Sequence, residues 1–192
     1  MKMECKEDRY SGDWDFEIKP YGINVAQNWR QVVAFLSMVT TYRVALFVEI
    51  GVYLGGVGTF LFPRCMYISN FFYLGVENDR KVVNPKHVEV LSSISNAELL
   101  YGDCFDPAVL LYISEKVRLT EGVAMILCDG DDKPKEMRTY SEFLRSGDII
   151  IMHDYASHIH GNTIDDMFTD GYEKVERGRY MKLAGLPSYR KL

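Results

Sequence analysis

The feature that most constrains the fold of this chain is a regular alternation between short apolar runs and longer segments with helical periodicity. The run at 43–50 is almost wholly apolar and rich in β-branched and aromatic residues, as strands buried on both faces of a sheet are. Just before it, Val32, Val33, Leu36 and Val39 recur at the three-to-four spacing of an amphipathic helix. Five such strands alternating with helices predict an α/β fold with a doubly wound, mostly parallel sheet and helices on both faces.

The same patterns set the expected order of elements. Strands are expected at 43–50, 71–77, 98–101, 124–129 and 148–153. Helices are expected at 25–41, 56–65, 84–95, 107–118, 134–145 and, as a short turn, 163–168. Weak alternation at 172–177 and 179–186 predicts a closing antiparallel hairpin at the C-terminus. Residues 1–20 show no clear period and are expected to form an N-terminal arm or lid, which leaves 21–192 as a single domain.

Composition excludes several classes of protein. The 192 residues are 47% hydrophobic and 26% charged, which is ordinary for one globular domain. With 22 Lys and Arg against 27 Asp and Glu, the net charge is −5 and no dense basic run exists, so a nucleic-acid partner is not expected. The apolar runs are shorter than a membrane helix needs, the charged N-terminus is unlike a secretory signal, and the four cysteines show no paired spacing. We therefore expect a cytoplasmic protein without a membrane partner.

Glycines and acidic side chains follow the predicted strands. Sheets of this kind bind ligands at the carboxyl ends of their strands, near the point where the strand order reverses. The first strand leads into the glycine-rich turn Glu49–Gly58, where glycines let the backbone turn tightly and approach a ligand closely. Glu77 ends the second strand, where a carboxylate can accept hydrogen bonds from both hydroxyls of a ribose.

The later strand ends continue this pattern. Asp103 follows the third strand, where an adenine would lie, and Asp129 and the pair His153-Asp154 follow the fourth and fifth. Each residue alone has a structural alternative; Asp106, for example, stands before a proline and is expected to cap the next helix. Taken together, the acids stand in an order that suits a nucleoside followed by a cation.

These residues resemble a known family. The segment Glu49–Gly56 resembles the E-x-G-x-x-x-G-G first motif of Rossmann-like, class I S-adenosylmethionine-dependent methyltransferases. The segments Cys128–Asp131 and Ser146–Asp154 resemble the D-G-D-H through G-G-x-hydrophobic-H-D block of one subgroup. That subgroup holds small-molecule O-methyltransferases of the rhamnosyl O-methyltransferase and cephalosporin hydroxylase type. Gly102–Pro107 and the pair Gln27-Asn28 are also similar to this type, and the resemblance covers about 22–155.

The resemblance implies roles for residues around the cofactor. The methionine end would be surrounded by the turn after the first strand, the ribose hydroxyls would be held after the second, and the adenine would be flanked after the third. The cofactor-binding residues implied in this way are Glu49, Gly51, Tyr53, Gly55, Glu77, Asp103, Cys104 and Asp129.

The resemblance also implies a metal site and a base. In metal-dependent members, acids after the fourth and fifth strands bind a divalent cation, which maps here onto Asp129 and Asp154. Magnesium would suit such oxygen ligands and would lower the pKa of a bound hydroxyl. The candidate catalytic residues are Asp131 and His153, with His153 as the general base. A structural role for His153 is the alternative.

Two departures from the family pattern keep other functions open. Asp132 stands where the motif has histidine, and His153 stands where an acid or asparagine is common. Our first interpretation is O-methylation of a small sugar-like or polyol acceptor with S-adenosylmethionine, assisted by magnesium and compatible with a homodimer. The alternatives are a nicotinamide-dependent oxidoreductase, whose G-x-G-x-x-G fingerprint is absent at 51–56, and a catalytically silent binding module. Lys133 and Lys135 are expected to be solvated surface charges.

Overall fold

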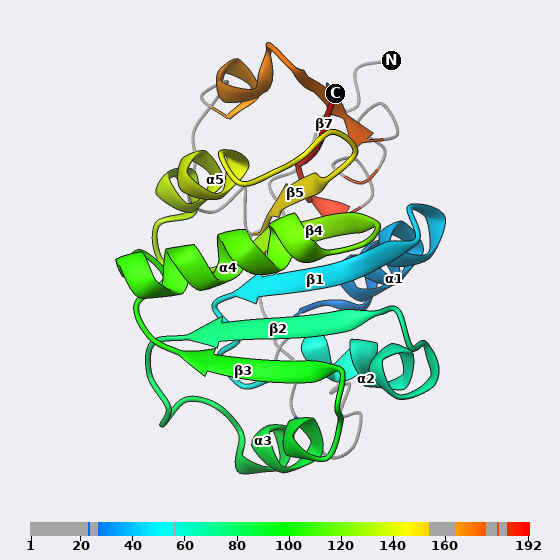
Figure 1. Cartoon of the computed structure of the whole chain (residues 1–192), viewed down its shortest axis with the longest axis vertical. Helices are drawn as coiled ribbons and strands as arrows, with labels where there is room; N and C mark the ends of the chain where they lie inside the picture. Colours follow the sequence, from blue (N-terminus) through cyan, green and yellow to red (C-terminus); the bar gives the residue numbers. More distant parts are fainter. Residues whose placement is uncertain (1–22, 24–26, 56, 154–163, 176–179, 181–183) are drawn as a thin grey trace, which may run out of the picture.

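The fold is built around one β-sheet. The computed structural model describes residues 23, 27–55, 57–153, 164–175, 180 and 184–192. These residues form a seven-stranded sheet in the order β3-β2-β1-β4-β5-β7-β6 (Figure 1). The strands β1 to β5 run parallel, whereas β7 pairs antiparallel with both β5 and β6. The strands are β1 (Val44–Ile50), β2 (Phe72–Glu77), β3 (Ala97–Tyr101), β4 (Val123–Cys128), β5 (Ile149–Met152), β6 (Tyr172–Lys174) and β7 (Ser188–Lys191).

Helices cover both faces of this sheet. Three of them contribute to one buried apolar cluster and two to the other, and in Figure 1 α4 crosses in front of the sheet while α1 and α2 lie behind it. The first group is α1 (Trp29–Thr41), α2 (Gly58–Tyr67) and α3 (Pro85–Ser92); the second is α4 (Pro107–Leu119) and α5 (Lys133–Ser141), with the short 3-10 turn η2 (Asp165–Phe168). The layers are therefore helix, sheet, helix, as the alternating pattern predicts.

The central strand β1 shows why its sequence is almost continuously apolar. All seven of its residues are buried. Val48 and Ile50 belong to the cluster beneath α4 and α5, whereas Phe47 belongs to the cluster beneath α1, α2 and α3. Because successive side chains of a strand point to opposite faces, Glu49 lies on the same face as Phe47, inside the protein.

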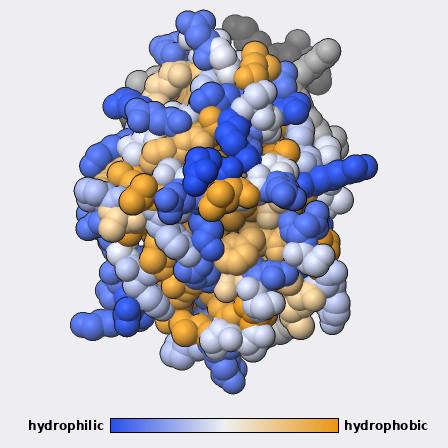
Figure 2. Space-filling model, in the orientation of Figure 1, coloured by the Kyte–Doolittle hydropathy of each residue, from blue (hydrophilic) through white to orange (hydrophobic). Residues whose placement is uncertain are grey.

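On the face seen in Figure 2, apolar side chains lie in small groups between polar ones. Leu111 and Leu119 of α4 are among the large apolar side chains that stay exposed. Within the part of the chain that the structure describes, no helix is long and apolar enough to cross a membrane.

The predicted doubly wound, mostly parallel sheet with antiparallel strands at its C-terminal end is confirmed. The predicted position of the last strand is wrong, because β7 lies at Ser188–Lys191 instead of 179–186. This segment fits between β5 and β6 because Tyr189 buries its ring against Phe168, with 4.5 Å between the ring centroids. The expected arm or lid at 1–20 lies outside the described residues.

A buried carboxylate joins the starting ends of β4 and β5. Asp148 is 1% exposed, and its oxygens accept hydrogen bonds from the amides of Ala124 and Arg145, each at 2.8 Å. The Arg145 guanidinium binds the same carboxylate at 3.0 Å and donates to the carbonyls of Thr120 and Gly122. This network holds the turns that lead into both strands.

Replacing Asp148 with alanine is expected to lower the free energy of unfolding by about 3 kcal/mol, because it leaves a buried amide and a guanidinium without their acceptor. Urea denaturation measures this loss. The exposed Asp170→Ala removes the same charge and serves as the control. A free energy of unfolding within about 0.5 kcal/mol of the native value would contradict the structural role given to Asp148.

Candidate functional site

The predicted site residues that the structure describes follow the carboxyl ends of the parallel strands β1 to β5. β1 pairs with β2 on one side and with β4 on the other, so the strand order reverses between β1 and β4. The helices that follow β1 and β4 pack on opposite faces of the sheet, and sheets of this kind bind ligands at such a reversal. The geometry of the loops after β1, β2, β4 and β5 therefore decides what the site can bind.

Glu49 holds the loop after β1 in place through hydrogen bonds. Its side chain is fully buried, and its oxygens accept hydrogen bonds from the amides of Val57 at 2.9 Å and Gly58 at 3.0 Å and from the Tyr73 hydroxyl at 2.7 Å. Burial raises the pKa of Glu49 to about 8, although these hydrogen bonds act in the opposite direction. The predicted cofactor residue Glu49 is thus the support on which the glycine turn and the start of α2 rest.

Gly51 lets this loop approach the end of β4. Its φ is +86°, and a Cβ at this position would lie 2.7 Å from the Asp129 carbonyl oxygen. Tyr53 follows with a φ of +50° and a half-exposed side chain. The turn is therefore shaped by backbone conformations that favour glycine, at the place where the sequence predicts the cofactor.

Gly55 packs on a histidine that sequence reasoning missed. A Cβ on Gly55, whose φ is +139°, would lie 2.9 Å from Nδ1 of His87. His87 is fully buried against the Phe62 ring, with 5.1 Å between ring centroids, and burial lowers its pKa to about 4. His87 is therefore neutral near pH 7 and serves as an uncharged platform beneath the loop. Its place on the inward face of α3 is the signal that the sequence offers for it.

Glu77 ends β2 and ties the first two loops together. It is 8% exposed; one oxygen accepts a hydrogen bond from the Tyr53 amide at 2.8 Å, and the other accepts from the amides of Asn78 at 2.9 Å and Asp79 at 3.1 Å. A carboxylate has about four acceptor positions, so three amide donors leave capacity for a further donor. The carboxylate is thus fixed at the edge of the sheet, where the sequence predicts a ribose.

The residues after β3 make local contacts. Asp103 accepts a hydrogen bond from the Phe105 amide at 2.8 Å, and the Cys104 carbonyl accepts one from the Tyr140 hydroxyl at 2.6 Å. Burial raises the pKa of the Cys104 thiol to about 12, so this thiol is neutral. Asp106 caps α4 by accepting from the Ala108 amide at 2.7 Å, which confirms the predicted cap. The structure places Asp103 and Cys104 on the β3 side of Glu77; their contact with an adenine stays a prediction.

Asp129 is the centre of the second half of the site. Its Oδ1 lies 2.7 Å from Nδ1 of His153 and 3.8 Å from Nζ of Lys133. Its Oδ2 accepts a hydrogen bond from Nε2 of Gln27 at 3.1 Å. Because a carboxylate only accepts hydrogen bonds, the histidine Nδ1 is the donor in that pair. The ends of β4 and β5, the start of α5 and the segment before α1 thus meet at one carboxylate.

Two charged side chains in the first turn of α5 are buried near Asp129. Lys133 is 7% exposed and donates to the Gly130 carbonyl at 2.8 Å, so the expectation that Lys133 is a solvated surface charge is wrong. Glu136, which sequence reasoning missed, is fully buried and accepts from the Gly130 amide at 3.2 Å, and burial raises its pKa to about 7. Both share the inward face of α5 with Met137 and Tyr140. That helical spacing is the signal that would have found them.

The other acids of this region lie apart from that cluster. Asp132 is the N-cap of α5, where its side chain accepts a hydrogen bond from the Lys135 amide at 3.2 Å. Asp131 is exposed in the turn before α5, so of the two candidate catalytic residues only His153 meets Asp129. Asp154 lies outside the described residues.

The described residues around Asp129 do not fit a magnesium site. Both carboxylate oxygens already accept hydrogen bonds, and an ammonium group lies close to one of them. Magnesium prefers a set of oxygen ligands, whereas the described side chains in direct contact with the Asp129 carboxylate are nitrogen donors. No group of three or more His, Cys, Asp or Glu among the described residues could hold a metal ion.

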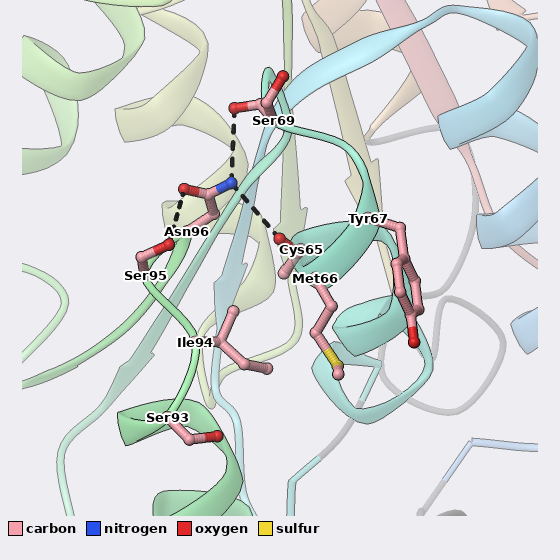
Figure 3. A pocket seen from close by; sticks show the side chains of 8 residues that line it. All are labelled: Cys65, Met66, Tyr67, Ser69, Ser93, Ile94, Ser95 and Asn96. Atoms are coloured by element: carbon pink, nitrogen blue, oxygen red, sulfur yellow. Dashed lines mark hydrogen bonds between the residues drawn. The ribbon is translucent and has the colours of Figure 1, made fainter.

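A cavity of about 420 Å³ lies elsewhere, between the end of α2 and the turn before β3 (Figure 3). Asn96 crosses it and donates to the carbonyls of Cys65 and Ser69, each at 3.4 Å. The cavity is lined by uncharged residues: Cys65, Met66, Tyr67, Ser69, Ser93, Ile94, Ser95 and Asn96. It adjoins the starting ends of the strands and shares no residue with the site.

The chain matches known proteins in family and in fold. The model of the rhamnosyl O-methyltransferase/CmcI family matches residues 13–177. A CmcI structure with SAH aligns with a TM-score of 0.62 at 18% identity, covering 88% of this chain and 79% of that chain. A CmcI structure with Mg and SAM aligns with a TM-score of 0.67 at 18% identity, covering 89% and 75%. The O-methyltransferase TomG from Streptomyces achromogenes, in complex with SAM, aligns with a TM-score of 0.56 at 12% identity, covering 79% and 74%. Among curated proteins, none matches the sequence.

The raised pKa of Glu49 predicts that the native protein loses stability as pH rises. In the unfolded chain the pKa of a glutamate is near 4.5, whereas burial raises the pKa of Glu49 to about 8 in the folded protein. The folded state therefore binds more protons between these values, and its stability falls by up to about 1.4 kcal/mol per pH unit. Glu136 contributes in the same direction up to about pH 7.

Glu49→Gln removes one of these two groups, so the stability of the variant is expected to fall less steeply between pH 5 and 8. Urea denaturation at three pH values measures the slope. The exposed Glu121→Gln controls for the loss of one charge. If the Glu49→Gln protein kept the native slope, the buried carboxyl would not be the group that titrates.

Proposed function

Because the chain belongs to the rhamnosyl O-methyltransferase/CmcI family, and is thus a class I S-adenosylmethionine-dependent methyltransferase, we propose that it methylates a hydroxyl oxygen of a small sugar-like or polyol acceptor. The observation that carries this proposal is the pairing of a tight glycine turn after β1 with a fixed carboxylate after β2, beside the reversal of strand order. Such an edge suits a nucleoside cofactor.

The cofactor would lie across the ends of β1 and β2. Gly51 lets the backbone come close to the methionine end, and Glu77 is positioned to accept a hydrogen bond from the ribose while three amides hold its carboxylate in place. Asp103 and Cys104, one strand farther, would flank the adenine. The half-exposed Tyr53 side chain stands beside the turn and would cover the bound cofactor.

The acceptor would meet the methyl group above β4 and β5. In this reaction the hydroxyl oxygen forms a bond to the methyl carbon, the carbon–sulfur bond breaks with its electron pair staying on sulfur, and the hydroxyl proton leaves to a base. His153 is the proposed base, because Asp129 orients its ring and stabilises the imidazolium that forms on proton uptake. Holding oxygen, carbon and sulfur in line supplies much of the rate.

No step of this mechanism is assigned to a divalent cation. The oxygens of Asp129, which the resemblance implies as metal ligands, are engaged by Gln27 and His153. The proton is therefore taken by a side chain in this proposal.

Calorimetry with S-adenosylhomocysteine tests the cofactor site. The native protein is expected to bind, and at 100 times its dissociation constant the ligand stabilises the fold by about 2.7 kcal/mol, which thermal unfolding detects. Absence of both heat and stabilisation at high micromolar ligand would refute the proposal.

Glu77→Ala is expected to weaken S-adenosylhomocysteine binding by about 10- to 100-fold, because it removes a charged hydrogen-bond acceptor of the ribose. Calorimetry measures the affinity, and circular dichroism checks that the variant is folded, since Glu77 also holds three amides. Glu89→Ala on the exposed side of α3 removes the same charge and should bind normally. Native affinity in a folded Glu77→Ala protein would contradict the ribose assignment.

A further inference from the structure

The Asp129 carboxylate contacts other side chains besides the proposed base, His153. Its side chain is 10% exposed, so water cannot balance its charge well. Among the described residues, three side chains contact it, Gln27, Lys133 and His153, and each brings a nitrogen. They come from three separate parts of the chain, so the carboxylate is enclosed by the fold itself.

Lys133 supplies a positive charge in this enclosure. Its side chain is 9% exposed, and its ammonium is anchored to the Gly130 carbonyl at 2.8 Å while it stands 3.8 Å from Asp129. An ammonium that is nearly removed from water is stabilised by a nearby carboxylate, and the converse also holds. Lys135, two residues farther, is exposed over the Phe105 ring and takes no part.

A divalent cation at Asp129 would meet two obstacles. It would compete with Gln27 and His153 for the lone pairs of the carboxylate oxygens, and it would lie close to the Lys133 ammonium. Repulsion between like charges is strong where water is scarce. Glu136, the other carboxyl beside Gly130, is fully buried, and one of its oxygens accepts from the Gly130 amide.

We propose that Lys133 takes the place of a divalent cation in this site: it balances the charge of Asp129, while Gln27 and His153 each donate a hydrogen bond to one of its oxygens. The proposal rests on the proposed methyltransferase function and deepens it. Lys133 is a positioning residue, because it acts through Asp129 on His153. Because the proposed reaction uses no cation that chelates two neighbouring substrate oxygens, it requires only one hydroxyl on the acceptor.

Manganese binding tests the proposal directly. Electron paramagnetic resonance of Mn²⁺, titrated into the full chain with S-adenosylhomocysteine present, reports free and bound metal. The native protein is expected to bind no Mn²⁺ at Asp129 below about millimolar concentration, and its midpoint of thermal unfolding should be the same in magnesium and in chelator. Tight binding that disappears in Asp129→Asn overturns the proposal, whereas binding that survives this change lies elsewhere and leaves Asp129 without metal, as proposed.

A second variant asks whether the nitrogen donors are what excludes the metal. The double change Lys133→Gln with His153→Asp removes the ammonium and adds a carboxylate, and it is expected to bind Mn²⁺ at least 10-fold more tightly than the native protein. Lys135→Gln with His153→Asp is the matched control and should gain less. A folded Lys133→Gln, His153→Asp protein that gains no more than this control would overturn the role given to Lys133.

The same samples separate this proposal from the proposed function. Calorimetry with S-adenosylhomocysteine in chelator reports the cofactor site alone. Failure to bind it refutes the methyltransferase function whatever the metal does. If S-adenosylhomocysteine binds in chelator and the Mn²⁺ titration shows tight binding at Asp129, only the role of Lys133 is refuted. If S-adenosylhomocysteine binds in chelator and the titration shows no Mn²⁺ at Asp129, both proposals are supported.

Discussion

The buried carboxyl of Glu49 is the contact on which the site depends. It lies on the inner face of the central strand and binds the first turn of α2 and the hydroxyl of Tyr73 on β2. Without an acceptor at this place, two amides at the start of α2 would be buried with no partner, which a protein interior rarely tolerates. The carboxyl therefore holds the glycine turn in a tight path between β2 and β4.

The other strand ends repeat this arrangement with different partners. Glu77 binds the amide of Tyr53 in the neighbouring loop, and Asp129 binds Gln27 and His153 from distant segments. Each carboxylate lies at the carboxyl end of a parallel strand and holds a neighbouring segment in place through hydrogen bonds. The edge is thereby prepared for a ligand, because its polar groups are already held in fixed directions.

Much of the site could be predicted from the sequence, because strand ends in a parallel sheet converge at one edge. The positions of Glu77, Asp129 and His153 at this edge were predicted in this way, from the alternation of strands and helices. Lys133 and Glu136 were not found in this way. They lie on a short helix whose inward face is set by Met137 and Tyr140 packing on the sheet, so their burial follows from docking and not from their own chemistry.

The sequence by itself determined the α/β class, the order of its elements and the acids at the strand ends, because apolar periodicity and turn residues act over short stretches of chain. Only the tertiary structure decided what those acids contact. The pairing of β1 with β4 brings the Asp129 backbone against Gly51, and the docking of α5 brings Lys133 to the Asp129 carboxylate. Such contacts join residues far apart in the chain and depend on strand order and helix docking, which local patterns do not encode.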